Sequence, residues 1–168
     1  MPTYTDIEKN LIQRAIARAT GLHQDQFDKS GFPYIAHPMR VMSQVAAWDF
    51  DYEYVMAAVL HDTVEDTDYS IEQACFEFSP RIGVILDGVT KRRGEKYLDF
   101  IDRILATDDH GTIAIKLADI YDNTQGWRLL NLPRGERDYL LGKYLQPQEL
   151  LLNALDDSWS TYPRIDRP

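Results

Sequence analysis

Hydrophobic positions along this chain recur at the spacing of an α-helix. Near the N-terminus, apolar side chains lie four residues apart at Ile7, Leu11 and Ala15, and a similar spacing returns at Ile82 and Ile85. Apolar residues that repeat every three to four positions bring one face of a helix against a core, whereas strands alternate at every second residue. The pattern therefore predicts an all-α protein.

Helix-start signals agree with this periodicity. Ser70 is followed three residues later by Gln73, which is the spacing of a capping box, and Ser79 precedes Pro80, which suits the first turn of a helix. Only residues 111–117 are rich enough in β-branched side chains to leave a strand open. We expect about seven or eight helices, over residues 5–20, 36–48, 52–66, 70–78, 80–92, 94–106, 111–126 and 136–155.

The length indicates one compact domain. A chain of 168 residues buries roughly 70% of the surface that its unfolded form exposes, so a hydrophobic core forms without help from disulfides. We expect this domain to cover residues 1–155. The remaining residues, 156–168, are rich in Asp, Ser and Pro, and we expect them to form a poorly ordered C-terminal tail.

The composition restricts the kinds of partner. The 18 Lys and Arg residues against 27 Asp and Glu residues give a formal net charge of −9, which repels the backbone of duplex nucleic acid. Cys75 is the single cysteine, so no intrachain disulfide forms and a cytoplasmic location is expected. The longest apolar run, residues 55–60, is far shorter than a membrane span, so we expect no membrane partner. A homo-oligomer remains compatible with the sequence.

Four ionisable side chains follow directly on an apolar helical run that ends at Leu60. They are His61, Asp62, Glu65 and Asp66, and their three- and four-residue spacings bring them onto about one turn of a helix. Three carboxylates at that distance repel one another unless a cation lies between them. One interpretation is therefore a divalent-metal site with neighbouring acids that handle water. The alternative is an ordinary acidic helix end, with His61 as a hydrogen-bonded core histidine.

Two further candidates for the same site lie elsewhere in the chain. His37 is followed by a proline, and Asp119 is embedded in one of the most apolar predicted helices, where unpaired carboxylates are rare. Asn123 is one turn after Asp119 and faces the same side. The alternative for Asp119 is a buried ion pair with Lys116 or Arg103. Two histidines and two aspartates suit a divalent ion with open positions, and mixed nitrogen and oxygen ligation fits Mn²⁺, Zn²⁺ or Fe²⁺ equally.

Basic residues are few and partly clustered. Lys91, Arg92 and Arg93 are consecutive and Lys96 follows closely, against the net charge of −9. This cluster can hold phosphate groups, or it can be a solvated helix end whose cations favour the C-terminal dipole. Lys29 is the other cation near the candidate site.

The order of these candidates resembles the H…HD…D signature of the HD-domain metal-dependent phosphohydrolases. The similarity continues through four stretches, Ser-Gly-Phe-Pro-Tyr-Ile-Ala-His-Pro at 30–38, the run at 57–67 ending His-Asp-Thr-Val-Glu-Asp-Thr, Asp-Gly-Val-Thr-Lys at 87–91, and Lys-Leu-Ala-Asp with a later Asn at 116–123. Together these stretches resemble the hydrolase domain of Rel/SpoT-type enzymes and the small alarmone hydrolases. The resemblance spans about residues 20–126.

This resemblance implies an HD-type helical bundle that removes the 3′-pyrophosphate from guanosine tetra- and pentaphosphate (ppGpp and pppGpp), giving GDP or GTP and pyrophosphate. It implies that Mn²⁺ is held by His37, His61, Asp62 and Asp119. It further implies that Glu65 and Asp66 position and activate the attacking water, and that Lys29 and Asn123 contact the substrate, to which the charge pattern adds Lys91 and Arg92.

Two departures from the family pattern concern recognition of the base. Asp28-Lys29 stands where the family has an Arg-Lys pair, and Thr124-Gln125-Gly126 stands where Met-Arg-Thr is common. Another 3′-phosphorylated nucleotide therefore stays open as substrate. The further alternatives are an HD-type nucleotidase or deoxynucleoside triphosphate hydrolase, which does not require Glu65 and Asp66, and a nucleotide-sensing helical binding module without activity.

Overall fold

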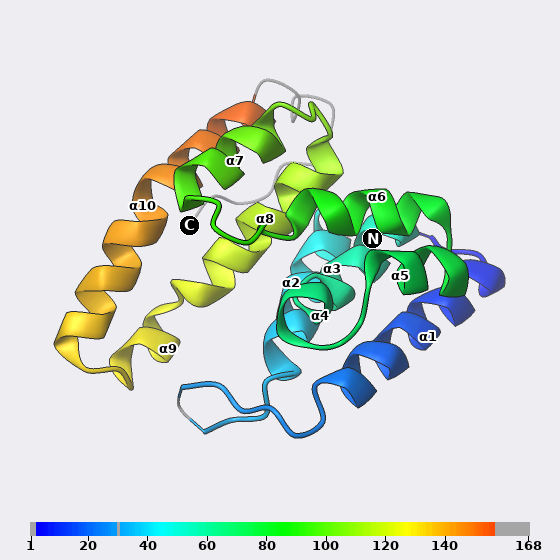
Figure 1. Cartoon of the computed structure of the whole chain (residues 1–168), viewed down its shortest axis with the longest axis horizontal. Helices are drawn as coiled ribbons and strands as arrows, with labels where there is room; N and C mark the ends of the chain where they lie inside the picture. The colour runs from blue at the N-terminus through cyan, green and yellow to red at the C-terminus, as the bar shows by residue number, and fades with distance from the viewer. Residues whose placement is uncertain (1–2, 30, 157–168) are drawn as a thin grey trace.

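The computed structural model describes residues 3–29 and 31–156, and within them the regular structure is helical (Figure 1). The one β feature in these residues is an isolated bridge between Phe27 and Pro33. The helices are α1 (Asp6–Leu22), α2 (Ala36–Ala47), α3 (Tyr52–Leu60), α4 (Thr63–Asp66), α5 (Ile71–Glu77), α6 (Pro80–Val89), α7 (Tyr97–Leu105), α8 (His110–Asn123), α9 (Gly126–Leu130) and α10 (Arg134–Asp156). Except for Asp156, the expected tail over 156–168 lies outside the described residues.

The all-α prediction is confirmed, and seven of the eight expected ranges each correspond to one of the longer helices. Ser70 and Ser79 cap α5 and α6 as their sequence contexts indicate. The segment that left a strand open, residues 111–117, is part of α8. The predicted helix over 52–66 is wrong as a continuous element, because α3 ends at Leu60 and the short α4 starts at Thr63. The other short helix, α9, follows α8 directly.

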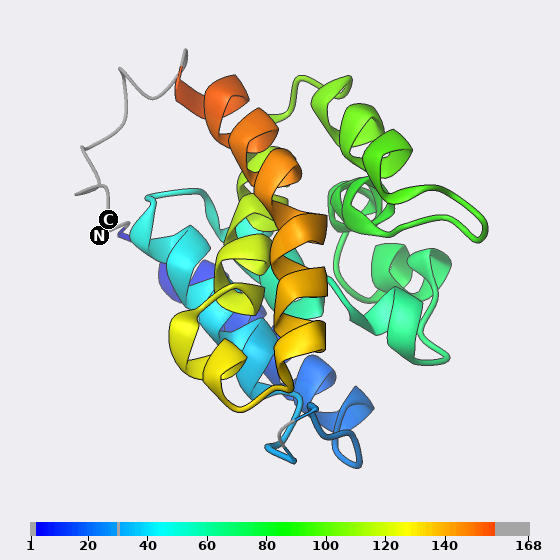
Figure 2. The ribbon, with the colours of Figure 1, turned by 90° about the vertical axis from the view of Figure 1, so that its left-hand side faces the viewer.

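Helices α3 and α8 form the centre of the bundle. Residues 55–60 of α3 and residues 111–120 of α8 are buried on all sides. Helices α1 and α2 pack on α3, α8 lies between α2 and α10, and α7 packs beside α10 (Figures 1 and 2). Each large apolar side chain that is fully buried in this way contributes about 2 kcal/mol to folding. The packing brings the C-terminal end of α3 against α2 and α8.

The break between α3 and α4 has a local cause. The Thr63 hydroxyl donates to the Leu60 carbonyl at 2.7 Å, and the His61 imidazole is hydrogen-bonded to the Ala58 carbonyl at 2.9 Å. Side-chain bonds of this kind compete with the helical hydrogen-bond ladder. They fix the turn at residues 61–62 and place both of these residues at the end of a buried helix.

No helix in the part of the chain described here has the length and apolar character that crossing a membrane requires.

Candidate active site

Three of the expected metal ligands meet at one point. His37 comes from the first turn of α2, and His61 and Asp62 come from the turn after α3. One ligand atom from each of the three lies within 4.8 Å of the others. Both histidines are 3% exposed, so the donor atoms lie inside the fold and not on an acidic surface.

Asp119 of α8 lies beside this group. Its Oδ1 atom is 3.2 Å from His37 Nε2 and 3.8 Å from His61 Nε2. The carboxylate is held by Lys116, whose Nζ donates to Oδ2 at 2.7 Å, and by Asn123, whose Nδ2 donates to Oδ1 at 2.6 Å. The ion pair with Lys116 is thus present together with the proximity to both histidines.

The alternative ion pair between Asp119 and Arg103 is not formed. Arg103 binds the Glu95 carboxylate, with its Nε atom 2.8 Å from Oε1, and also donates to the Thr90 carbonyl at 2.9 Å. Arg103 therefore holds the loop between α6 and α7 and leaves Asp119 to Lys116.

The hydrogen bonds of the two imidazoles orient them for metal binding. His37 Nδ1 is 2.6 Å from Asp122 Oδ2, and His61 Nδ1 is 2.9 Å from the Ala58 carbonyl. With the proton on Nδ1, each ring presents the lone pair of Nε2 to the shared point. His61 Nε2 is buried and has no hydrogen-bond partner among the described residues. A divalent cation between these nitrogens and the carboxylates of Asp62 and Asp119 satisfies every one of these groups, so the donor set fits a metal ion.

Asp122 is a functional candidate that sequence reasoning missed. Its carboxylate is 6% exposed and accepts hydrogen bonds from His37, from Arg40 at 2.5 and 3.0 Å, and from Arg128. A carboxylate behind a metal-ligating histidine fixes the tautomer and the orientation of the ring. The signal was available, because Asp122 follows Asp119 by three residues on the same apolar helix.

The surrounding charges hold a proton on the site when no cation is bound. Burial alone lowers the pKa of His61, but Asp62 and Asp119 outweigh it and raise the pKa to about 9. The ring is therefore protonated at pH 7 in the metal-free protein, and a metal ion must displace that proton. By the same linkage, the stability that this shift gives to the metal-free fold is present below pH 6.5 and is lost as the pH rises toward 9.

We therefore expect metal binding to release protons at pH 7 and the apparent affinity to rise with pH up to about 9. Calorimetric titration of the metal in buffers of different protonation enthalpy counts the released protons. A binding heat at pH 7 that does not depend on the buffer would contradict this expectation.

Glu65 and Asp66 lie next to the metal candidates on α4. Glu65 Oε1 accepts a hydrogen bond from the backbone N–H of Lys91 at 2.7 Å, and burial raises the pKa of Glu65 above its usual value. Burial and the charge of Asp62 likewise raise the pKa of Asp66. A carboxylate with a raised pKa is a better proton acceptor near neutral pH than an ordinary surface acid.

A cavity of about 230 Å³ opens onto this group. Of the residues expected to act in the site, those that line it are His37, Asp62, Glu65, Lys91, Asp119 and Asn123. His61, Asp66, Lys29 and Arg92 are not among its lining residues. Lys29 is paired with Glu136 at the start of α10 at 3.1 Å, and the Arg92 guanidinium group is 3.8 Å from the Asp87 carboxylate. Lys29 and Arg92 are both mostly exposed, so their roles as substrate contacts stay predictions.

The cavity wall includes further residues that no sequence motif indicated. Tyr34 donates its hydroxyl hydrogen bond to Asp62 at 2.6 Å and lies in the stretch that carries the family resemblance. Tyr97 comes from α7, and Lys143 and Tyr144 come from α10. The last three lie in ordinary amphipathic helices, and only the packing of α7, α8 and α10 brings them to the site.

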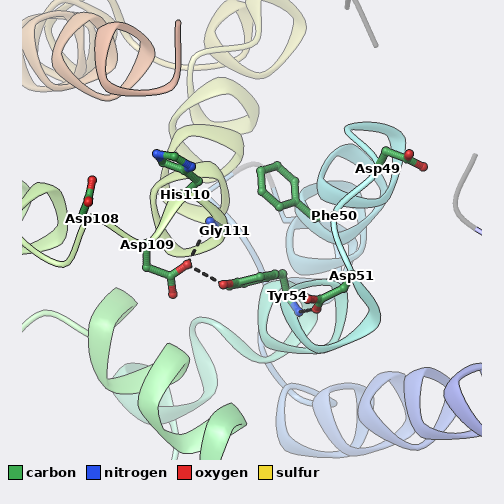
Figure 3. A pocket seen from close by; sticks show the side chains of 8 residues that line it. All are labelled: Asp49, Phe50, Asp51, Tyr54, Asp108, Asp109, His110 and Gly111. Carbon is green, nitrogen blue, oxygen red and sulfur yellow. Dashed lines mark hydrogen bonds between the residues drawn. The ribbon is translucent and has the colours of Figure 1, made fainter. Parts of the chain in front are cut away.

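A larger cavity of about 420 Å³ lies between the starts of α3 and α8, away from the metal candidates (Figure 3). Two of the four aspartates that line it make hydrogen bonds at the starts of these helices. Asp51 caps α3 by accepting from the backbone N–H of Tyr54, and Asp109 accepts from the Tyr54 hydroxyl at 2.5 Å and from the N–H of Gly111 at 3.2 Å. Helix capping explains these carboxylates, so we assign no function to this cavity.

Comparison with known proteins identifies the family. A family model described as an HD domain matches residues 15–113 of this chain. The chain belongs to the HD-domain family. The matched range contains His37, His61 and Asp62, whereas Asp119 lies beyond its end, on the part of α8 that the family model does not cover.

Two curated relatives of this HD domain share a name. A guanosine-3′,5′-bis(diphosphate) 3′-pyrophosphohydrolase from Aquifex aeolicus is 39% identical over 120 residues, which cover 68% of this chain and 17% of that protein. The protein of the same name from Haemophilus influenzae is 40% identical over 134 residues, which cover 74% of this chain and 19% of that protein. The chain thus spans less than a fifth of the length of these relatives.

A solved structure confirms the HD-type fold. It comes from a metazoan ortholog of SpoT that hydrolyses ppGpp and plays a role in starvation responses. The two structures superpose with a TM-score of 0.69 over 94% of this chain and 97% of that one, at 24% sequence identity.

Proposed function

We propose that this HD domain is a metal-dependent pyrophosphohydrolase that removes the 3′-pyrophosphate of ppGpp and pppGpp to give GDP or GTP. The observation that carries the proposal is the convergence of His37, His61, Asp62 and Asp119 on one point, beside a cavity that His37, Asp62, Asp119 and Glu65 line. Its relatives' names support the substrate. A cytoplasmic location is part of the proposal.

In this mechanism the four converging residues would hold Mn²⁺, and the ion would supply Lewis acidity that lowers the pKa of water at the site. Glu65 orients the attacking water and accepts its proton, a task for which burial has raised its pKa. Asp66 supports Glu65 from the same turn of α4. Lys91 and Asn123 face the cavity, where their donors offset the charge of phosphoryl oxygens.

Recognition of the base is the part of the proposal that the departures from the family pattern affect. Asp28 stands where the family has a cation, and its carboxylate accepts from the backbone N–H of Phe32 at 2.9 Å. The side chain therefore stabilises its own turn. An HD domain with this turn can take another 3′-phosphorylated nucleotide, which is the second candidate substrate.

The test is a Mn²⁺-dependent digestion of ppGpp with separation of the products. Release of GDP and pyrophosphate is the expected result. Deoxynucleoside triphosphates and 3′-phosphorylated adenine nucleotides serve as parallel substrates. If one of these is cleaved and ppGpp is not, the alarmone is rejected as substrate and the assignment as a hydrolase stands. If no substrate is cleaved, the result favours a binding module without activity. Metal content after gentle purification separates that last case, because an inactive module needs no bound metal.

A further inference from the structure

A buried hydroxyl without a partner lies in the wall of the active-site cavity. Tyr97 of α7 lines this cavity, and its Oη atom is buried and has no hydrogen-bond partner among the described residues. A buried polar group that makes no hydrogen bond costs free energy, so such groups are rare in folded proteins. The Tyr97 hydroxyl therefore requires an explanation that its own fold does not give.

The Tyr97 hydroxyl is a hydrogen-bond donor. Burial raises its pKa well above the usual 10, and the carboxylates of Asp119 and Glu65 raise it further. The phenol consequently keeps its proton at neutral pH and can donate to an acceptor that enters the cavity.

A cation without an ion-pair partner among the described residues lies over the ring of Tyr97. Lys143 of α10 places its Nζ atom 4.6 Å from the centre of the Tyr97 ring and 4.8 Å from that of Tyr144, and donates to the Tyr144 hydroxyl at 3.4 Å. In the part of the chain that the structure describes, no carboxylate is within ion-pair distance of it. The neighbouring Lys116, in contrast, is paired with Asp119.

The position of Lys143 is unfavourable for a free ammonium group. Burial lowers the pKa of Lys143 and the charges of Lys116 and Lys91 lower it further, while the charges of Asp119 and Glu65 offset this only in part. An anion beside Nζ relieves this repulsion. The cation–π contacts with the two tyrosine rings hold the ammonium group in place on the cavity wall.

The charges that line the cavity point to the same kind of ligand. Three lysines and three carboxylates line it, namely Lys91, Lys116, Lys143, Asp62, Glu65 and Asp119. With the proposed metal bound, its two positive charges leave the cavity with an excess of positive charge. Tyr97 adds a hydrogen-bond donor to the wall of the same cavity.

We propose that Tyr97 and Lys143 form an anion subsite that binds a phosphate group of the substrate next to the group that reacts. The proposal rests on the proposed function and extends it to residues of α7 and α10. Tyr97 donates one hydrogen bond to a phosphate oxygen, and Lys143 supplies a charge-assisted second one. No covalent step involves either residue.

The test measures binding of pyrophosphate to the metal-loaded protein, after free metal is removed, by calorimetry. Tyr97→Phe removes the hydroxyl alone and Lys143→Met removes the charge but keeps the length of the side chain. We expect each variant to weaken pyrophosphate binding by about 10-fold with unchanged metal content. Tyr52→Phe at the start of α3 and Lys9→Met on α1, neither of which lines the cavity, are the matched controls and should bind as the unaltered protein does.

Thermal unfolding distinguishes this role from a structural one. Because the Tyr97 hydroxyl has no partner, Tyr97→Phe should melt at the same temperature as the unaltered protein or above it. A lower melting temperature, or pyrophosphate affinities unchanged in both variants, would overturn the proposal. Parallel titration with GDP tells whether the subsite takes the pyrophosphate or the 5′-phosphates of the nucleotide.

The binding experiment does not depend on turnover. If ppGpp is not hydrolysed but Tyr97 and Lys143 still control pyrophosphate affinity, the proposed substrate fails and the anion subsite stands. If ppGpp is hydrolysed and neither variant changes the affinity or the KM, the proposed function stands and the subsite fails.

Discussion

Replacement of Asp62 by Asn is expected to lower the rate of hydrolysis by at least about 1,000-fold, because the amide removes a charged ligand from the proposed metal. The fold should survive. Asp62 is partly exposed, makes no capping hydrogen bond to α4, and its replacement still offers an oxygen to the Tyr34 hydroxyl. Product separation after incubation with ppGpp measures the rate, and far-ultraviolet circular dichroism checks the helices. Retained turnover would remove Asp62 from the metal site.

Glu65→Gln is the matched comparison for Asp62→Asn. The side chain keeps its size, and its amide oxygen can still accept from the Lys91 N–H, but it can no longer take a proton from water. The two variants should therefore separate into a metal-deficient protein and a metal-replete but slow one. Metal analysis makes the distinction. Loss of metal from Glu65→Gln would move this residue into the ligand set.

Replacement of Asp122 by Asn should have the largest effect on stability. The carboxylate balances two guanidinium groups, those of Arg40 and Arg128, and holds His37 through Nδ1. Removal of one member of a buried charge network leaves the others uncompensated, and since Arg40 is about one third exposed we expect a loss of about 2 to 3 kcal/mol. Metal affinity should fall by about 10- to 100-fold, because the imidazole loses its anchor.

Urea unfolding and metal titration measure the two effects of Asp122→Asn. Asp138→Asn is the control, because Asp138, like Asp122, has an arginine as its partner. Its carboxylate is 3.7 Å from Arg134 on α10, and the Asp138 side chain is 67% exposed. This exposed pair should contribute less than about 1 kcal/mol. Equal losses of unfolding free energy in the two variants would show that the buried charge network stabilises the fold no more than an exposed ion pair does.

The sequence was sufficient for the parts of this site that depend on local spacing. His61 and Asp62 were recognisable because polar residues follow an apolar run, and Asp119 because it interrupts another. The turn at residues 61–62 could not be predicted, because helical periodicity continues through it. Only the side-chain hydrogen bonds to the Ala58 and Leu60 carbonyls end α3.

Residues that reach the cavity through tertiary packing were not predictable in the same way. Tyr97 and Lys143 lie in helices whose patterns say which face is buried but not which neighbours it meets. Asp122 differs from them, because it lies on the same helix as Asp119. Its burial could have been predicted from the apolar residues around it in the sequence. Its role could not have been predicted, because that role depends on the contact with His37, which is 85 residues away in sequence.

The donor atoms of the metal site are spread from residue 37 to residue 119, on three segments that meet only when α2, α3 and α8 are packed together. An unfolded chain cannot present them at one point. The metal ion thus acts as a ligand of the native state alone, and by mass action free metal at 100 times its dissociation constant adds about 2.7 kcal/mol to the free energy of unfolding. Under the proposed function, a shortage of metal therefore lowers both the rate of hydrolysis and the stability of the folded protein.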